Sequence, residues 1–157
     1  MLQIHVALSL IGIVSGLVVL YGLLSGRPLG GWTALFLATT VLTSVTGFPL
    51  APFGFDPPRA VGVISLVLLA LAVAALYVFR LAGAWRWVYV GSAIAALYLN
   101  VFVGVVQAFQ KLPFLQPLAP TQSEPPFLIA QVAVLAIFIV LGILAAIRFH
   151  PELEASA

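Results

Sequence analysis

The sequence contains no cysteine and very few charged residues. Without cysteine there is no disulfide framework, no thiolate nucleophile and no cysteine metal site, and the redox compartment is left open. Charged residues make up 6% of the 157 positions, where a soluble domain has about a quarter. Six Lys and Arg against four Asp and Glu form no basic stripe, so we expect no nucleic-acid partner.

Apolar residues dominate the chain instead. They make up 64% of the sequence, and the mean hydropathy is +1.25. A 16.6 kDa globule in water could not bury so many apolar side chains in one small core. The composition therefore excludes a water-soluble fold and predicts that the lipid bilayer surrounds the chain.

Five apolar stretches are long enough, or nearly long enough, to cross a bilayer, which takes about 20 residues. Every charged residue lies outside them, as the cost of a charge in lipid requires. The predicted fold is an all-α bundle of five transmembrane helices that forms one domain over residues 1–149, followed by a short cytoplasmic tail, residues 150–157. The predicted spans are residues 2–24, 32–48, 60–79, 87–107 and 126–147.

Two of these stretches have alternative interpretations. Residues 32–48 are short and contain six Ser and Thr residues. Hydroxyls can bond to carbonyls of their own helix, which favours a full crossing over a re-entrant or surface segment. Residues 2–24 lack a positive n-region and an obvious cleavage site, which favours a retained helix over a signal peptide.

The basic residues predict an orientation. Alternate joints divide them four to two: Arg27, Arg80, Arg86 and Arg148 on one side, Arg59 and Lys111 on the other. Because loops rich in Lys and Arg stay in the cytoplasm, we expect the N-terminus outside and the C-terminus inside. The predicted location is the inner, or plasma, membrane, crossed several times.

Polar side chains inside the predicted spans gather toward the outer face. Steps of four and three place Asn100, Gly104 and Gln107 on one helix face, and similar steps align His5 with Ser9 and Gly12. We therefore expect the first, second and fourth helices to meet around a small polar pocket near that face. The ligand-pocket candidates are His5, Ser9, Thr43, Thr46, Asn100, Gln107 and Gln131, and the expected helix-packing glycines are Gly12, Gly16 and Gly104.

The same pattern has a purely structural interpretation. Helix bundles in lipid use Ser, Thr, Asn and Gln to join helices, and polar groups near helix ends cost little there. Asn100 is the residue that proximity to the surface explains least, because it lies deepest along its span. Both interpretations stay open at this point.

The residues offer little chemistry for catalysis. No paired carboxylates, Ser-His-Asp set or HExxH motif lies in a span. His5 is alone in the predicted membrane region and His150 falls at the opposite side, so no facing pair for haem and no zinc site is predicted. We expect no enzyme activity, no metal and no cofactor.

The predicted function is that of a small, non-catalytic accessory or scaffold subunit. It would dock on a larger membrane protein complex or on a second copy of itself. The alternative is binding or transport of a lipid-like, quinone-like or other uncharged small molecule in the outer polar pocket.

Overall fold

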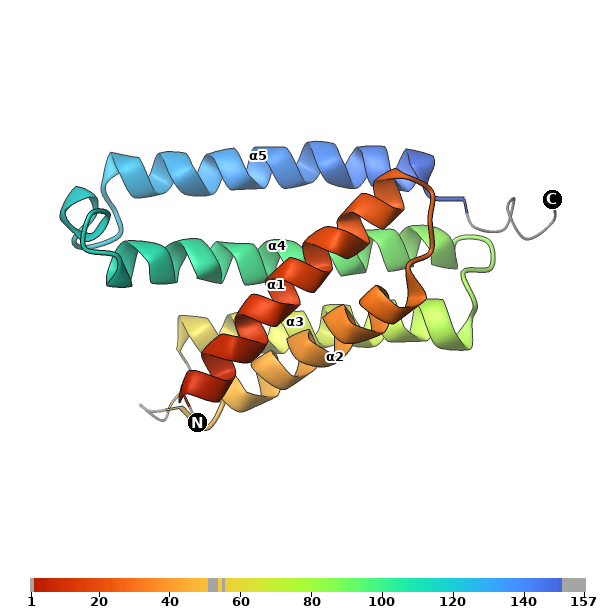
Figure 1. The fold of residues 1–157 in the computed structure, drawn as a ribbon, viewed down its shortest axis with the longest axis horizontal. Coiled ribbons are helices and arrows are strands. Elements are labelled where there is room, and N and C mark those ends of the chain that lie inside the picture. Colours follow the sequence, from red (N-terminus) through yellow and green to blue (C-terminus); the bar gives the residue numbers. More distant parts are fainter. Residues whose placement is uncertain (1, 51–53, 55, 151–157) are drawn as a thin grey trace.

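The protein is all helical. The computed structural model describes residues 2–50, 54 and 56–150, is 81% helical and has no strand within that part of the chain. Figure 1 shows the order of the elements. They are α1 (Leu2–Leu24), α2 (Gly30–Gly47), α3 (Pro57–Val73), the π-helix η1 (Ala74–Val78), α4 (Trp85–Lys111), the 3-10 helix η2 (Gln116–Leu118) and α5 (Pro125–Arg148).

Four helices are long and apolar enough to cross a membrane: Leu2–Leu24, Pro57–Val78, Trp85–Lys111 and Pro125–Arg148. The predicted all-α membrane bundle is confirmed to that extent. The helix α2 has 18 residues and is not among the four. Its threonines lower its hydropathy, so composition alone does not identify it as a span.

The helices form two layers (Figure 1). The helices α3, α4 and α5 lie side by side, and α1 and α2 pack together across them. Consecutive helices run in opposite directions, so Leu2 and Arg148 lie at opposite ends of the bundle. α4 contacts α1, α3 and α5 and is the central helix.

Local chemistry explains where several elements begin and end. Asp56 caps α3 by accepting a hydrogen bond from Arg59 N at 3.1 Å, and Pro57 and Pro58 fit the first turn because they need no amide donor. Gly26, at φ +71°, ends the turn after α1. After η1 the chain reverses through Arg80 and Leu81, both with positive φ, and through Gly83.

The core lies between the layers, and the outer surface is apolar. Phe36, Leu69 and Leu97 are almost fully buried. On the outside, Ile129 and Val132 expose 67% and 65% of their surface. Many large apolar side chains are exposed in this way, which is the surface that lipid stabilises and water does not.

The helices cover the predicted stretches with small shifts at the ends. α1 has the predicted bounds, while α3 begins earlier because its prolines belong to the helix. The π-helix η1 has no counterpart in the sequence prediction. Residues 151–157, most of the predicted tail, lie outside the described residues.

Candidate functional site

Three helices meet at a polar contact near the middle of the bundle. Asn100 of α4 donates a hydrogen bond from Nδ2 to Oγ1 of Thr40 of α2, at 3.2 Å. Gly12 of α1 lies against both: a Cβ atom there would be 3.3 Å from Thr40 Oγ1 and 3.4 Å from Asn100 Nδ2 and from Thr39 Oγ1. We call Gly12, Thr39, Thr40 and Asn100 the central polar contact. It exists because glycine lets α1 approach the two hydroxyls and the amide closely.

A second polar contact joins α1 to the end of α2. His5 Nδ1 lies 3.0 Å from Thr46 Oγ1. Thr46 also donates to the Leu42 carbonyl at 2.7 Å, so its hydroxyl oxygen accepts from the His5 ring when Nδ1 carries the proton. Gly47 leaves room for the imidazole, because a Cβ there would lie 3.3 Å from His5 Cε1.

The threonines of α2 bond mainly to their own helix. Thr39 Oγ1 donates to the Leu35 carbonyl at 2.7 Å, and Thr43 Oγ1 donates to the Thr39 carbonyl at 2.8 Å. Such bonds satisfy the hydroxyls without a partner helix. Both threonines are also buried in the bundle, while Leu35 and Leu42 are exposed. α2 is therefore less polar on its surface than its composition suggests.

Gln131 lies at a different interface, between α5 and α4. Its Nε2 donates to the carbonyl of Phe102 at 3.2 Å. Only 8% of the residue is exposed, and its Oε1 is the one buried side-chain oxygen or nitrogen without a hydrogen-bond partner among the described residues. The structure therefore separates Gln131 from the contacts of α1, α2 and α4.

The remaining predicted residues are spread over the same helices. Ser9 is partly buried on α1, one turn from His5, and Gln107 is exposed on α4. Two hydrogen bonds join members of the seven ligand-pocket candidates in the described part of the chain. One lies between His5 and Thr46 of different helices, and in the other Thr46 donates to the Thr43 carbonyl of its own helix at 3.2 Å. The proposed role of the candidates in binding a ligand stays a prediction.

The predicted packing glycines differ in how closely they are approached. A Cβ on Gly16 would lie 2.5 Å from Leu97 Cδ1 and 2.9 Å from the Phe36 ring. At Gly104 the nearest atom would be Ile13 Cδ1 at 3.5 Å, an ordinary contact. Of the three predicted packing glycines, Gly16 is therefore the one that cannot carry a side chain without moving its neighbours. Gly22 of α1, which the sequence did not indicate, is similarly restricted, because a Cβ there would lie 2.9 Å from the Arg27 carbonyl oxygen.

Two arginine side chains donate hydrogen bonds to carbonyls at helix ends. Arg59 donates to the carbonyls of Phe48 at 3.2 Å, Leu50 at 2.9 Å and Gly54 at 2.7 Å, and pairs with Asp56 at 2.9 Å. Arg86 of α4 donates to two carbonyls at the end of α5, those of Ala146 and Phe149, and lies 4.2 Å from the Trp87 ring centroid. Both guanidinium groups satisfy carbonyls that a helix end leaves without partners.

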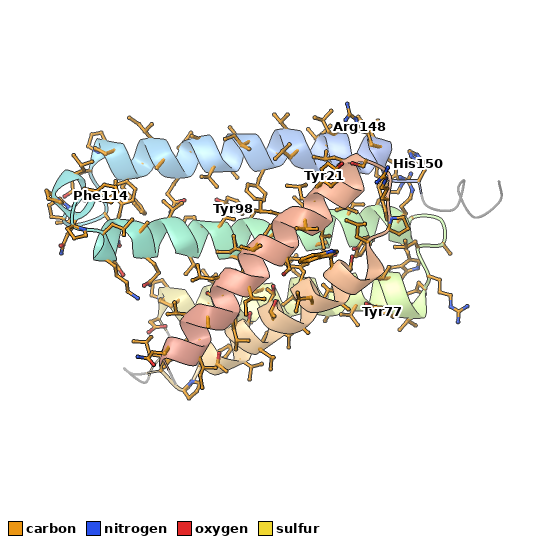
Figure 2. The ribbon with its side chains drawn as sticks, in the orientation of Figure 1. Tyr21, Tyr77, Tyr98, Phe114, Arg148 and His150 are labelled. Atoms are coloured by element: carbon orange, nitrogen blue, oxygen red, sulfur yellow. The ribbon has the colours of Figure 1, made fainter. Side chains whose placement is uncertain are left out.

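The charged residues of the structure divide between the two ends of the bundle. We call one the arginine end; Arg148, His150, Tyr21 and Tyr77 mark it in Figure 2. The other we call the mixed end. The arginine end carries Arg27, Arg80, Arg86 and Arg148, and the mixed end carries Asp56, Arg59, Lys111 and Glu124.

A hollow lies at the arginine end of the bundle. It has a volume of about 270 Å³ and is half open. Val19 and Leu23 of α1, the α1–α2 joint, η1, and Tyr89 and Phe149 surround it. None of the seven ligand-pocket candidates lines this cavity or the smaller hollow between α1 and α4. We call the 270 Å³ hollow the arginine-end cavity.

No protein-family model, curated protein or solved structure matches the chain. Among the described residues there is no group of three or more His, Asp or Glu side chains that could hold a metal ion.

Sequence reasoning did not identify several residues of these sites. Thr40 is fully buried and is the partner of Asn100, but its neighbour Thr39 carries the same signal, and only the helix rotation distinguishes them. Tyr89 and Thr33 line the arginine-end cavity, yet each resembles an ordinary residue near a helix end. No sequence pattern indicates that their helices leave a hollow between them.

Proposed function

We propose that the chain is an integral membrane protein that crosses the membrane five times, with its N-terminus outside and its C-terminus inside. Support for the fifth crossing comes from the direction of the helices. α1 and α3 run the same way, and α2 runs in the opposite direction. The start of α2 lies beside the end of α1, where Leu29 is close to Gly22. The end of α2 lies beside the start of α1, where Thr46 contacts His5. If α1 and α3 both cross, the chain must return through α2.

The orientation is supported by the separation of charge. Four arginines lie at the arginine end, while the two basic residues at the mixed end are accompanied by Asp56 and Glu124. Arg59 is also neutralised by its ion pair with Asp56. By the positive-inside tendency the arginine end faces the cytoplasm, which is consistent with a plasma or inner membrane.

Labelling of single cysteines tests this topology, because the chain has none of its own. Ser25 and Ala84 are exposed at the arginine end, and Pro49 and Gln116 are exposed at the mixed end. In intact cells an impermeant maleimide should label Pro49→Cys and Gln116→Cys but not Ser25→Cys and Ala84→Cys. Equal labelling at 25 and 49 would show that α2 does not cross, and the reverse pattern would invert the orientation.

Within that membrane we propose a non-catalytic accessory or scaffold subunit. Its main support is that polar side chains of the membrane helices join helix to helix. Asn100 bonds Thr40, His5 bonds Thr46 and Gln131 bonds the Phe102 carbonyl. Bonds of this kind hold a fixed shape and are typical of a structural role.

Co-purification tests the scaffold proposal. Extraction from native membranes in a mild detergent, followed by native mass spectrometry, should give a stoichiometric complex with a second membrane protein or a second copy of the chain. A monomer under conditions that keep other membrane complexes intact would contradict the proposal.

A second candidate function is binding of an uncharged, lipid-like or quinone-like molecule at the central polar contact. Asn100 favours it, because the side chain is only partly buried and its amide can form more hydrogen bonds than the one to Thr40. Asn100→Leu should then abolish retention of a co-purified small molecule while the protein still inserts. Loss of insertion or folding instead would support the structural interpretation.

A further inference from the structure

The arginine-end cavity combines apolar walls with hydroxyl groups and one cation. Leu23 and Phe149 are buried in its wall, Tyr89 is 2% exposed, and the exposed Arg27 and Tyr77 also line it. Such a lining does not suit a fully apolar chain, because the guanidinium and the hydroxyls would lose water without gaining partners. It suits an amphiphile with an anionic group.

Neighbouring contacts keep the cavity open. Arg86 donates to the Phe149 carbonyl at 2.6 Å, and the rings of Tyr89 and Phe149 pack 5.9 Å apart. The π-helix η1 also lines the cavity, and it replaces regular α-helix just where Tyr77 lies. A π-helix displaces the backbone locally and is often found at functional sites. The hollow is thus formed by ordered elements before any ligand binds.

The charge at this end selects an anion. Arg27 lies in the cavity lining, and all four arginines lie at the same end, while Asp56 and Glu124, the carboxylates in the described part of the chain, lie at the other. Arginine offers planar paired donors that match a phosphate. Basic pockets between membrane helices on the cytoplasmic side commonly hold anionic lipid headgroups.

The depth of the cavity favours a lipid over a soluble anion. Tyr21 and Tyr77 surround this end of the bundle (Figure 2), and Trp32 and Trp87 are exposed there. These aromatic residues sit at the level of the headgroups in membrane proteins. A volume of 270 Å³ equals about nine water molecules, which is enough for the phosphate and glycerol region of one lipid but not for its acyl chains.

We propose that the arginine-end cavity binds the headgroup of one anionic phospholipid, with the phosphate at Arg27 and the acyl chains running outside along the apolar helix surface. The Tyr77 hydroxyl is exposed and available to the phosphate and glycerol oxygens, while the Tyr89 hydroxyl lies against the Thr33 side chain in the same lining. The Thr33 hydroxyl, in contrast, already donates to the Leu29 carbonyl at 2.9 Å. This site is independent of the scaffold role and of the polar contacts at the other interfaces.

Native mass spectrometry of the delipidated full chain in detergent tests the site, with phosphatidylglycerol and phosphatidylcholine of identical acyl chains as probes. We expect one phosphatidylglycerol to bind at least about tenfold more tightly than phosphatidylcholine. Arg27→Gln should lower the affinity for phosphatidylglycerol about tenfold, which is the effect of losing one charge-assisted hydrogen bond. Arg80→Gln, at an exposed arginine of the same end that does not line the cavity, is the control for general surface charge.

Substitutions at two neighbouring glycines test whether the lipid binds in the cavity or on the nearby surface. Gly30 lines the cavity and Gly31 does not, and a Cβ at either position meets no atom within 4 Å. Gly30→Leu should block the lipid without changing any charge, while Gly31→Leu should bind as the wild type does. Circular dichroism of both variants shows that each is folded.

Three outcomes would overturn the proposal. The first is equal binding of the two lipids, and the second is an equal effect of Arg27→Gln and Arg80→Gln. The third is unchanged binding by Gly30→Leu. Glycerol 3-phosphate is the soluble arm of the same experiment: if it displaces the lipid at comparable concentration, the cavity recognises a free organic phosphate and the assignment to a lipid is wrong.

Discussion

Glycine 16 sets how closely α1 approaches the rest of the bundle. Its missing side chain leaves space that Leu97 and Phe36 fill, and both of these residues are almost fully buried. Gly12 is less crowded, since a Cβ there meets its nearest neighbour at 3.3 Å. The small-residue spacing in the sequence indicates a packing face, but it does not indicate which glycine is indispensable.

We predict that Gly16→Val destabilises the protein by about 1–3 kcal/mol, the usual cost of overpacking a well-filled core. The added atoms would push Leu97 and Phe36 out of their positions. Unfolding in mixed micelles, followed by circular dichroism, measures the change. Gly91→Val is the matched control, because a Cβ at Gly91 meets no atom within 4 Å; equal loss in both variants would contradict the packing role of Gly16.

At the scale of elements, Arg59 holds the joint between α2 and α3. Its side chain, 12% exposed, contacts three carbonyls and one carboxylate, which belong to four different residues of the joint. The carbonyls of Phe48 and Leu50 belong to the end of α2, where the helix leaves acceptors without partners. The joint is therefore closed by charge-assisted bonds rather than by apolar packing.

Replacing Arg59 by Gln should lower the free energy of unfolding by about 1.5–3 kcal/mol, because partly buried carbonyls lose a charged donor. Arg59→Lys should recover only part of the loss, since an ammonium group lacks the planar fork. Arg80→Gln serves as the reference, because that residue is exposed. If Arg59→Gln unfolds like Arg80→Gln, the joint does not depend on these bonds.

The turn before α5 depends on the ionised form of Glu124. The hydrogen bond that the Thr121 hydroxyl donates at 2.7 Å lowers the pKa of the Glu124 carboxyl below its ordinary value, and the Ser123 amide donates at 3.1 Å. Because the folded pKa is the lower one, this stabilisation is complete above the ordinary pKa of glutamate. It is lost as the pH falls through the lowered value.

Thr121→Val should therefore raise the pKa of Glu124 toward its ordinary value. Carboxyl carbon NMR in micelles can follow the titration, since the chain contains only three glutamates and Glu124→Gln assigns the signal. Gln116→Ala, a change in the same loop without a recorded bond to Glu124, should leave the pKa where it is in the wild type. An unshifted titration in Thr121→Val would show that the hydroxyl does not hold the carboxylate.

At the scale of the whole molecule, the sequence predicts the helices well and the hollow poorly. Uninterrupted apolar length, prolines and glycines indicate where α1, α4 and α5 lie, because the requirements of lipid act on each segment separately. The arginine-end cavity depends on the joint placement of Leu23, Tyr89 and Phe149 from three helices. Such a placement follows from helix rotation and from η1, for which no local sequence signal is known.

The polar residues illustrate the same limit. Periodicity places Asn100 and Gly12 on helix faces that could meet, and the structure has them in contact. It does not distinguish Thr39 from Thr40 as the hydrogen-bond partner, and it does not separate Gln131, which faces Phe102 across another interface. Assigning a hydrogen-bond partner requires the rotation of both helices relative to each other. The spacing of residues in the sequence defines only which residues share a face of one helix.

The distribution of arginine should control the orientation of the entire bundle. Removing two positive charges in Arg80→Gln/Arg148→Gln leaves two basic residues at each end, and we predict a mixed population in which the maleimide reaches both Gln116→Cys and Ala84→Cys. Lys111→Gln, which increases the asymmetry instead, should keep one orientation. A uniform population after the double substitution would mean that features other than these charges determine insertion.

The threonine hydroxyls of α2 bond to carbonyls of their own helix, and this affects how many membrane-spanning segments the sequence is judged to contain. Thr39 and Thr43 are buried, and each donates to a carbonyl one turn back, so a segment of polar composition presents mainly apolar side chains such as Leu42 to its surroundings. An algorithm that sums residue hydropathies will omit this segment. Because each crossing exchanges the two compartments, and α2 crosses in the proposed topology, that single omission would place every later loop, from Asp56 to Arg148, on the side opposite to the proposed one.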